Sequence, residues 1–98
     1  MNEKILERAI IVYGEERQKR KTVEEIGEYL QAVNKLDEAI LKDNLEQCKY
    51  EKQHLQEEIA DCLIMFHQMR LIYGPQEVDT FILEKLCRLE MRIDEASM

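Results

Sequence analysis

Two pairs of carboxylates have the spacing expected of metal ligands on helices. The first pair is Glu25 and Glu28, and the second pair is Glu58 and Asp61. The acids of each pair are three residues apart, so on a helix both side chains project from one face about one turn apart. Both pairs border apolar residues, and Asp61 begins a long apolar stretch where an uncompensated charge would be costly. The spacing therefore indicates carboxylates close to a helix–helix contact.

Four converging carboxylates would either take up protons or bind a cation. Two like charges about 5 Å apart repel by roughly 3 kcal/mol at an effective dielectric constant of about 20. Carboxylates without histidine or cysteine partners suit Mg²⁺, with Mn²⁺ as an alternative, because both ions prefer oxygen ligands and leave positions for water and phosphate. Such a centre supports metal-assisted attack of water on a phosphoryl group. The chain has 21 acids, however, so acid pairs also arise by chance on a solvated helix face, and spacing alone leaves both interpretations open.

Further polar residues extend both pairs along their helix faces. Gln18 and Lys21 share a face with the first pair if the helix is continuous through Thr22. Lys21 would then place a cation near phosphate oxygens, and Gln18 an amide near a sugar or base. Taken alone, both residues are more typical of solvated surface. A similar face further along the chain contains His54, Glu58, Asp61, Met65 and Gln68.

The sequence argues against iron and zinc. Glu51 and His54 have the Glu-x-x-His spacing of di-iron carboxylate bundles, but that fold needs two such motifs and the chain has one. Cys48, Cys62 and Cys87 are far apart and form no Cys-x-x-Cys motif. Three such cysteines are typical of small core residues in a reducing compartment, not of zinc ligands or disulfides.

Length and composition favour a single all-α domain over residues 1–98. The chain has 98 residues, is 45% hydrophobic and 36% charged, and contains three glycines and one proline. This composition predicts a globular protein made of a few long helices with short connections. The net charge of −7 argues against a protein that covers duplex nucleic acid, because nothing would offset phosphate repulsion across a broad face.

Neither export nor membrane insertion is predicted. The N-terminal residues MNEKILERAI are charged early and lack the apolar core of a signal peptide. The longest apolar run, CLIMF, is too short to cross a bilayer. We therefore expect a soluble, cytoplasmic protein without membrane contact.

Hydrophobic periodicity predicts four helices. The expected segments are Asn2 to Arg20, a second helix beginning near Thr22, Asn44 to Tyr73, and Gln76 to Ala96. Thr22 followed by Glu25 matches a capping box, and the alternative is that Thr22 lies inside a helix continuing from the first. The connection from Asn34 to Asp43 is either a helical extension or a short turn.

The same periodicity predicts the buried faces and an oligomer. The residues expected to face inward are Val23, Ile26, Leu30 and Val33 in the second helix, Leu55, Ile59, Cys62, Phe66 and Met69 in the third, and Val78, Phe81, Ile82, Leu86, Leu89 and Ile93 in the last. The third helix would be roughly 45 Å long at ~1.5 Å per residue. A chain that is 45% apolar exposes too much of such a helix in one thin bundle, so we expect copies of the chain to associate.

The ordered set of motifs resembles the MazG-like all-α nucleoside triphosphate pyrophosphatases. That family has Glu-x-x-Glu on one helix and Glu-x-x-Asp on the next, which match Glu25-Ile26-Gly27-Glu28 and Glu58-Ile59-Ala60-Asp61. The lead-in from Tyr13 to Gln18 with Lys21, the run Glu57 to Met65 and the ending Lys85 to Ile93 are also similar. The resemblance covers most of the chain, from about Tyr13 to Ile93. This chain departs from the family in a long separation between the acidic pairs and in having no tryptophan to stack a base.

The resemblance implies a fold, a reaction and residue roles. It implies a four-helix-type bundle whose subunits pair, as a homodimer or homotetramer, with the active site between helices. It implies Mg²⁺-dependent cleavage of a (d)NTP between the α- and β-phosphates, giving a nucleoside monophosphate and pyrophosphate. The implied roles are metal binding by Glu25, Glu28, Glu58 and Asp61, orientation of water by Glu24 or Glu25, phosphate contact by Lys21, Lys85 and Arg88, and nucleoside contact by Gln18.

An alternative hypothesis keeps the fold without catalysis. The chain would then be a helical oligomer with a regulatory or accessory role, and the carboxylates would form a solvated face. Within the enzyme hypothesis, the base, the sugar and the choice between standard and modified nucleotides stay open. Phosphoribosyl-ATP is ranked lower as a substrate because His67 lies later than the histidine of the enzymes that cleave it.

Overall fold

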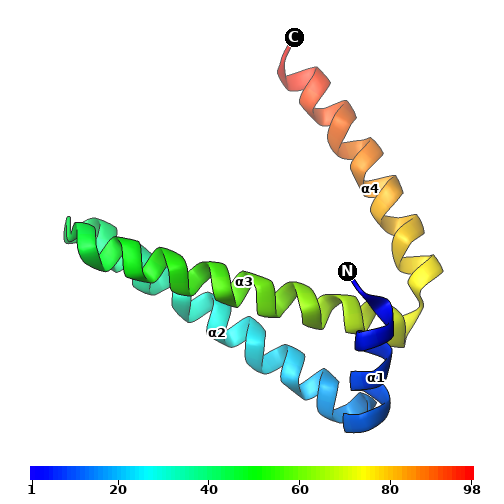
Figure 1. Cartoon of the computed structure of the whole chain (residues 1–98). Helices are drawn as coiled ribbons and strands as arrows, with labels where there is room; N and C mark the ends of the chain where they lie inside the picture. The colour runs from blue at the N-terminus through cyan, green and yellow to red at the C-terminus, as the bar shows by residue number, and fades with distance from the viewer.

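The computed structural model describes the whole chain, Met1–Met98, as four α-helices without a strand. The helices are α1 (Glu3–Tyr13), α2 (Glu15–Leu41), α3 (Leu45–Tyr73) and α4 (Pro75–Ala96). In Figure 1, α2 and α3 run side by side, α1 lies at one end of the pair, and α4 points away from it. None of the helices is long and apolar enough to cross a membrane. The expected all-α class with four helices is confirmed.

The helices end at residues that favour non-helical backbone. Gly14 and Gly74 have φ angles of +89° and +125°, which side-chain-bearing residues rarely adopt, and each glycine separates two helices. Pro75 begins α4, where its missing N–H leaves no helical hydrogen bond unmade. Asn44 caps α3, because its Oδ1 atom accepts a hydrogen bond of 3.1 Å from the backbone N–H of Gln47.

The break at Gly14 corrects two predicted boundaries. The first helix ends just before Gly14 rather than at Arg20, and the second helix includes Thr22 instead of beginning there. Thr22 does not cap a helix, since its hydroxyl donates to the carbonyl oxygen of Gln18 at 2.8 Å, as threonines inside helices often do. Gln18 and Lys21 therefore lie on the same helix as the first acidic pair.

α2 and α3 form a hairpin that contains most of the tertiary contact in the chain. Of the segment 34–43, the part up to Leu41 extends α2, and a short turn then leads to Leu45. With 27 and 29 residues, the two helices are nearly equal in length and cover each other. This hairpin is the framework on which both acidic pairs are placed.

The seam between α2 and α3 is polar to an uncommon degree. Eleven residues of the chain are buried, and six of these are polar or charged. The buried residues of the two helices are Gln18, Thr22, Glu25, Ala32 and Ala39 on α2, and Glu51, Glu58, Cys62, Met65 and Gln68 on α3. Many of them recur at intervals of three and four, as in a coiled-coil seam. The two alanines, 0% and 3% exposed, allow the helices to approach closely.

Much of the predicted apolar face lies outside this seam. Cys62 is buried as expected, but Val23, Ile59 and Phe66 are 71%, 41% and 48% exposed. The prediction placed the most apolar face of each helix against its neighbouring helix. In the structure, α2 and α3 instead contact each other through the faces that carry small and polar side chains. The apolar side chains form a groove on the outside of the hairpin, lined by Ile26, Tyr29, Leu30, Ile59, Cys62, Leu63 and Phe66.

α4 buries no residue in this chain. Val78 is half-buried, but the rest of its predicted inward face is exposed, namely Phe81, Ile82, Leu86, Leu89 and Ile93. The helix contacts α3 alone, near the turn at Gly74. The inward assignment is therefore wrong for a single chain, because no other helix of the chain reaches this face.

Arg70 holds the start of α4 against α3 and α1. Its Nε and Nη2 atoms donate to the two carboxylate oxygens of Asp79 at 2.7 and 2.6 Å. Its Nη1 atom donates to Glu3 at 2.9 Å. Three helices are thus joined at one guanidinium group, whose planar fork suits such bidentate pairing.

Candidate metal centre

Three carboxylates from two helices converge in the middle of the hairpin. Glu25 from α2 and Glu58 and Asp61 from α3 each offer one oxygen, and these oxygens all lie within 4.8 Å of one another. The helical spacing of three residues places Glu58 and Asp61 on one face of α3, and the seam brings Glu25 opposite them. One acid of the first predicted pair therefore meets both acids of the second pair.

Two of these carboxylates are buried and incompletely satisfied. Glu25 and Glu58 are 6% and 8% exposed. The Oε2 atom of each is buried without a hydrogen-bond partner. Buried carboxylate oxygens are normally paired, because leaving one unpaired costs the desolvation energy of a charged group. Asp61, by contrast, is exposed, so the cluster opens to solvent on its side.

The electrostatics of the cluster show crowding of negative charge. The pKa of Glu58 is raised above its ordinary value, mainly by burial and further by the charges of Glu25 and Asp61. The pKa of Glu28 is also raised, mainly by its interaction with the neighbouring carboxylate of Glu25. Glu28 thus lies beside Glu25 and belongs to the same cluster, which we call the four-carboxylate cluster.

Lys21 is the cation nearest to the cluster on α2. Its Nζ atom lies 3.2 Å from Oε1 of Glu25 and 3.8 Å from Oε1 of Glu24. The carboxylates raise the pKa of Lys21, so its ammonium group stays charged. Glu24 is exposed and is not among the three converging acids, so Glu25 is the better placed of the two predicted water-orienting residues.

Two further side chains lie at the cluster, although the sequence interpretation did not assign them to the site. His54 lies between two acids, with Nε2 3.5 Å from Oε1 of Glu58 and Nδ1 3.9 Å from Oε2 of Glu51. The thiol of Cys62 donates to the carbonyl oxygen of Glu25 at 3.4 Å, and burial raises its pKa. His54 was recognisable from its shared face with Glu58, but that spacing alone does not distinguish it from a surface residue.

Gln18 is not at the cluster. It is 7% exposed, and its Nε2 atom donates to Oε1 of Gln68 at 2.6 Å inside the seam. The view of Gln18 as a solvated residue is therefore wrong. Gln18 lies two turns of α2 away from Glu25, and its amide is hydrogen-bonded to Gln68. The amide is therefore not free to contact a nucleoside.

Lys85 and Arg88 are not brought to the cluster within one chain. Both are exposed residues of α4, which contacts α3 alone and points away from the hairpin in Figure 1. A phosphate contact by either residue would need a different copy of the chain.

Comparison of the chain with protein-family models, curated proteins and solved structures finds no match. The likeness to MazG-like pyrophosphatases therefore depends on the motifs described above. What the structure adds is the convergence of the two acidic motifs.

The donor set fits a hard divalent cation. All the converging atoms are carboxylate oxygens, which suit Mg²⁺ or Mn²⁺ and not zinc or iron–sulfur chemistry. The unpartnered Oε2 atoms of Glu25 and Glu58 provide acceptor positions that no side chain of the protein satisfies.

Proposed function

We propose that this chain is a Mg²⁺-dependent nucleoside triphosphate pyrophosphohydrolase of the MazG-like type. The observation that supports it best is the meeting of Glu25, Glu58 and Asp61 across the seam, with buried carboxylate oxygens that lack donors. Water would add across the anhydride between the α- and β-phosphates, giving a nucleoside monophosphate and pyrophosphate. Three of the four motif residues of the resemblance, Glu25, Glu58 and Asp61, are those that converge, and the fourth, Glu28, interacts with Glu25.

Each residue has a role that follows from its position. Glu25, Glu28, Glu58 and Asp61 would hold Mg²⁺. When bound, the ion would neutralise charge on the phosphate oxygens and lower the pKa of a bound water. Glu25, or Glu24 beside it, orients the attacking water. Lys21 fixes the Glu25 carboxylate and adds a positive charge on the side where phosphates would lie.

We also propose that the working form is a homodimer or homotetramer. The outer groove of the hairpin, about 450 Å³ in volume, is lined only by apolar and aromatic residues and cysteine. α4 exposes its apolar face along its length. A second copy of the chain offers matching apolar surfaces, and its Lys85 and Arg88 would supply the cations that a single chain keeps away from its cluster. Such patches on a soluble protein mark interaction surfaces.

The test is a panel of ribo- and deoxyribonucleoside triphosphates with Mg²⁺, in which released pyrophosphate is measured and the monophosphate is identified by chromatography. Glu58→Gln and Asp61→Asn are expected to abolish release. Glu57→Gln removes a neighbouring exposed charge on α3 and serves as the matched control, with activity retained. Mg²⁺ is also expected to raise the melting temperature of the wild type and not of Glu58→Gln.

The non-catalytic alternative gives the opposite pattern. If no nucleotide is cleaved at micromolar enzyme and Mg²⁺ changes neither melting temperature nor binding, the enzyme proposal is wrong. Under this alternative, the stability of the wild type and that of a variant with all four acids neutralised would both be independent of Mg²⁺.

A further inference from the structure

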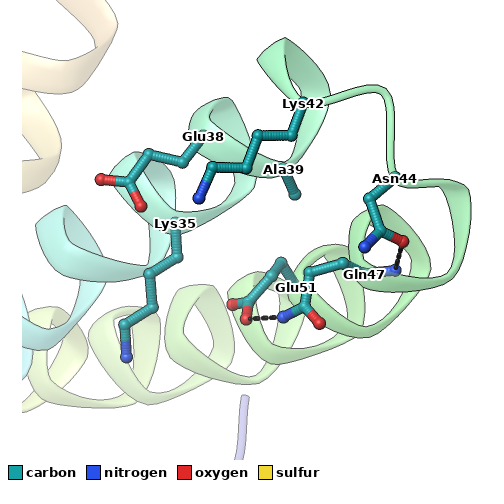
Figure 2. Close-up of a pocket in the computed structure, with 7 residues that line it drawn as sticks. All are labelled: Lys35, Glu38, Ala39, Lys42, Asn44, Gln47 and Glu51. Carbon is teal, nitrogen blue, oxygen red and sulfur yellow. Dashed lines mark hydrogen bonds between the residues drawn. The ribbon is translucent and has the colours of Figure 1, made fainter.

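A polar pocket lies at the turn between α2 and α3, away from the four-carboxylate cluster. It has a volume of about 320 Å³ and a single apolar lining residue, Ala39. Figure 2 shows that Lys35 comes from the last turns of α2, that Lys42 directly follows α2, and that Gln47 and Glu51 come from the first turns of α3. Because Ala39 is small, it leaves this space open between longer polar side chains.

Glu51 makes this pocket a candidate ligand site. Its side chain is 8% exposed, and its Oε1 atom accepts a hydrogen bond of 2.7 Å from Nε2 of Gln47. Its Oε2 atom is buried without any hydrogen-bond partner. Neither Lys35 nor Lys42 forms an ion pair with it or with any other acid. A buried carboxylate oxygen without a donor is costly, so the site calls for an N–H or O–H group from a ligand.

The pocket and the four-carboxylate cluster lie on the same face of the hairpin. Glu51 precedes Glu58 by seven residues on α3, and Lys35 follows Glu28 by seven on α2. Seven residues are two helical turns, or about 10.5 Å along the axis. His54 lies between the two sites and approaches both Glu51 and Glu58. A nucleotide whose phosphates are held at the cluster would have to span this distance to place its base in the pocket.

On this basis we propose that the pocket is a base subsite that selects nucleotides whose base carries an exocyclic amino group. The inference rests on the proposed pyrophosphohydrolase function. The amino group of cytosine, adenine or guanine donates to Oε2 of Glu51, in the way that carboxylates accept from cytosine N4 in nucleic acids. Uracil and thymine present a ring N–H flanked by two carbonyl oxygens, which the carboxylate repels. Lys35 and Lys42 attract the anionic nucleotide to an otherwise acidic face.

The wild-type protein provides the first test. We expect kcat/KM with Mg²⁺ to be about tenfold or more higher for CTP, ATP and GTP than for UTP, TTP and ITP, since a hydrogen bond to a charged group is worth at least that factor. Equal values across the two groups, or faster cleavage of the second group, overturn the base subsite while leaving the proposed function intact.

Glu51→Gln tests the residue itself. A neutral amide accepts more weakly and can turn its own N–H groups toward a carbonyl, so the preference for amino-bearing bases is expected to be lost or reversed. Glu57→Gln, which removes an exposed charge on the same helix, is expected to keep the preference. A preference that survives Glu51→Gln in a folded variant contradicts the assignment.

A metal-free binding measurement separates the two proposals. Calorimetry with CMP and UMP, without Mg²⁺, probes the pocket independently of cleavage. Tighter binding of CMP that is lost in Glu51→Gln supports the base subsite even if no triphosphate is hydrolysed, in which case only the proposed function fails. Equal binding of the two monophosphates overturns the base subsite.

Discussion

Glu25 and Glu58 meet across the seam of the hairpin, and each has a buried Oε2 atom without a hydrogen-bond partner. Burial, together with the charges of Glu25 and Asp61, raises the pKa of Glu58, so the charged form of Glu58 is disfavoured at this point of the seam. Without a cation, repulsion between these carboxylates therefore destabilises the hairpin at the proposed Mg²⁺ site. Binding sites commonly lower the stability of a protein in this way, because the groups that bind the ligand are unfavourable without it.

Removing one charge of the cluster is expected to stabilise the metal-free protein. Glu58→Gln keeps the shape of the side chain but relieves repulsion with Glu25 and Asp61. Its free energy of unfolding, measured by urea denaturation in EDTA, should equal or exceed that of the wild type. A clear loss of stability would show that the Glu58 carboxylate makes favourable interactions within the chain and is not free to bind a metal ion.

The metal-free protein is expected to lose stability as pH rises from 4.5. The pKa values of Glu28 and Glu58 are raised from the ordinary 4.5 in the folded state. Between 4.5 and those raised values, the folded protein binds more protons than the unfolded chain, so the free energy of unfolding falls with increasing pH. Saturating Mg²⁺ holds the acids ionised and should remove this slope. Urea titrations at several pH values, with and without Mg²⁺, measure it.

The buried Gln18–Gln68 pair is expected to be structural. Gln18→Leu leaves the Oε1 atom of Gln68 without its 2.6 Å donor and should cost about 1–3 kcal/mol. The double replacement of Gln18 and Gln68 by leucine removes both polar groups and should recover most of the loss, as a double-mutant cycle by urea denaturation would show. A rise in KM for nucleotide in the double variant, with stability restored, would instead make Gln18 a nucleoside contact.

The outer groove is expected to mediate self-association. Sedimentation of the wild type at micromolar concentration should show a dimer or tetramer. Phe66→Asp places a charge in the apolar groove and should shift the protein toward monomer. Tyr50→Asp changes an exposed aromatic residue outside the groove and is the matched control. A wild type that sediments as a monomer would contradict the proposed assembly.

The helix boundaries were predicted well where the signal lies within a few residues of the boundary itself. The third helix ends at Tyr73 as predicted, and the predicted starts at Asn44 and Gln76 are each one residue from the observed starts at Leu45 and Pro75. At Thr22 the sequence left two alternatives open, because a capping-box pattern also fits the interior of a helix, and the structure places Thr22 inside α2. The break between the first two helices falls at Gly14, whose φ of +89° is incompatible with a continuous helix.

The burial pattern could not be predicted as well, because it depends on how each helix is rotated about its own axis. Hydrophobicity favoured a seam through Ile59 and Phe66, yet the chain closes on Ala32 and Ala39 and leaves the apolar side chains outside. Hydrophobic periodicity identifies the apolar face of a helix, but it does not show which other helix, or which copy of the chain, covers that face. The exposed faces of α4 and of the outer groove show this most clearly.

The amino-acid spacing is enough to place each acidic pair on one helix face, because three residues correspond to about one turn of the helical repeat. The convergence of Glu25, Glu58 and Asp61, the pairing of Gln18 with Gln68 and the place of Glu51 in a pocket became known from the folded chain. Those relationships join residues far apart in the chain. They depend on the register and rotation of α2 against α3, which packing sets and local spacing does not.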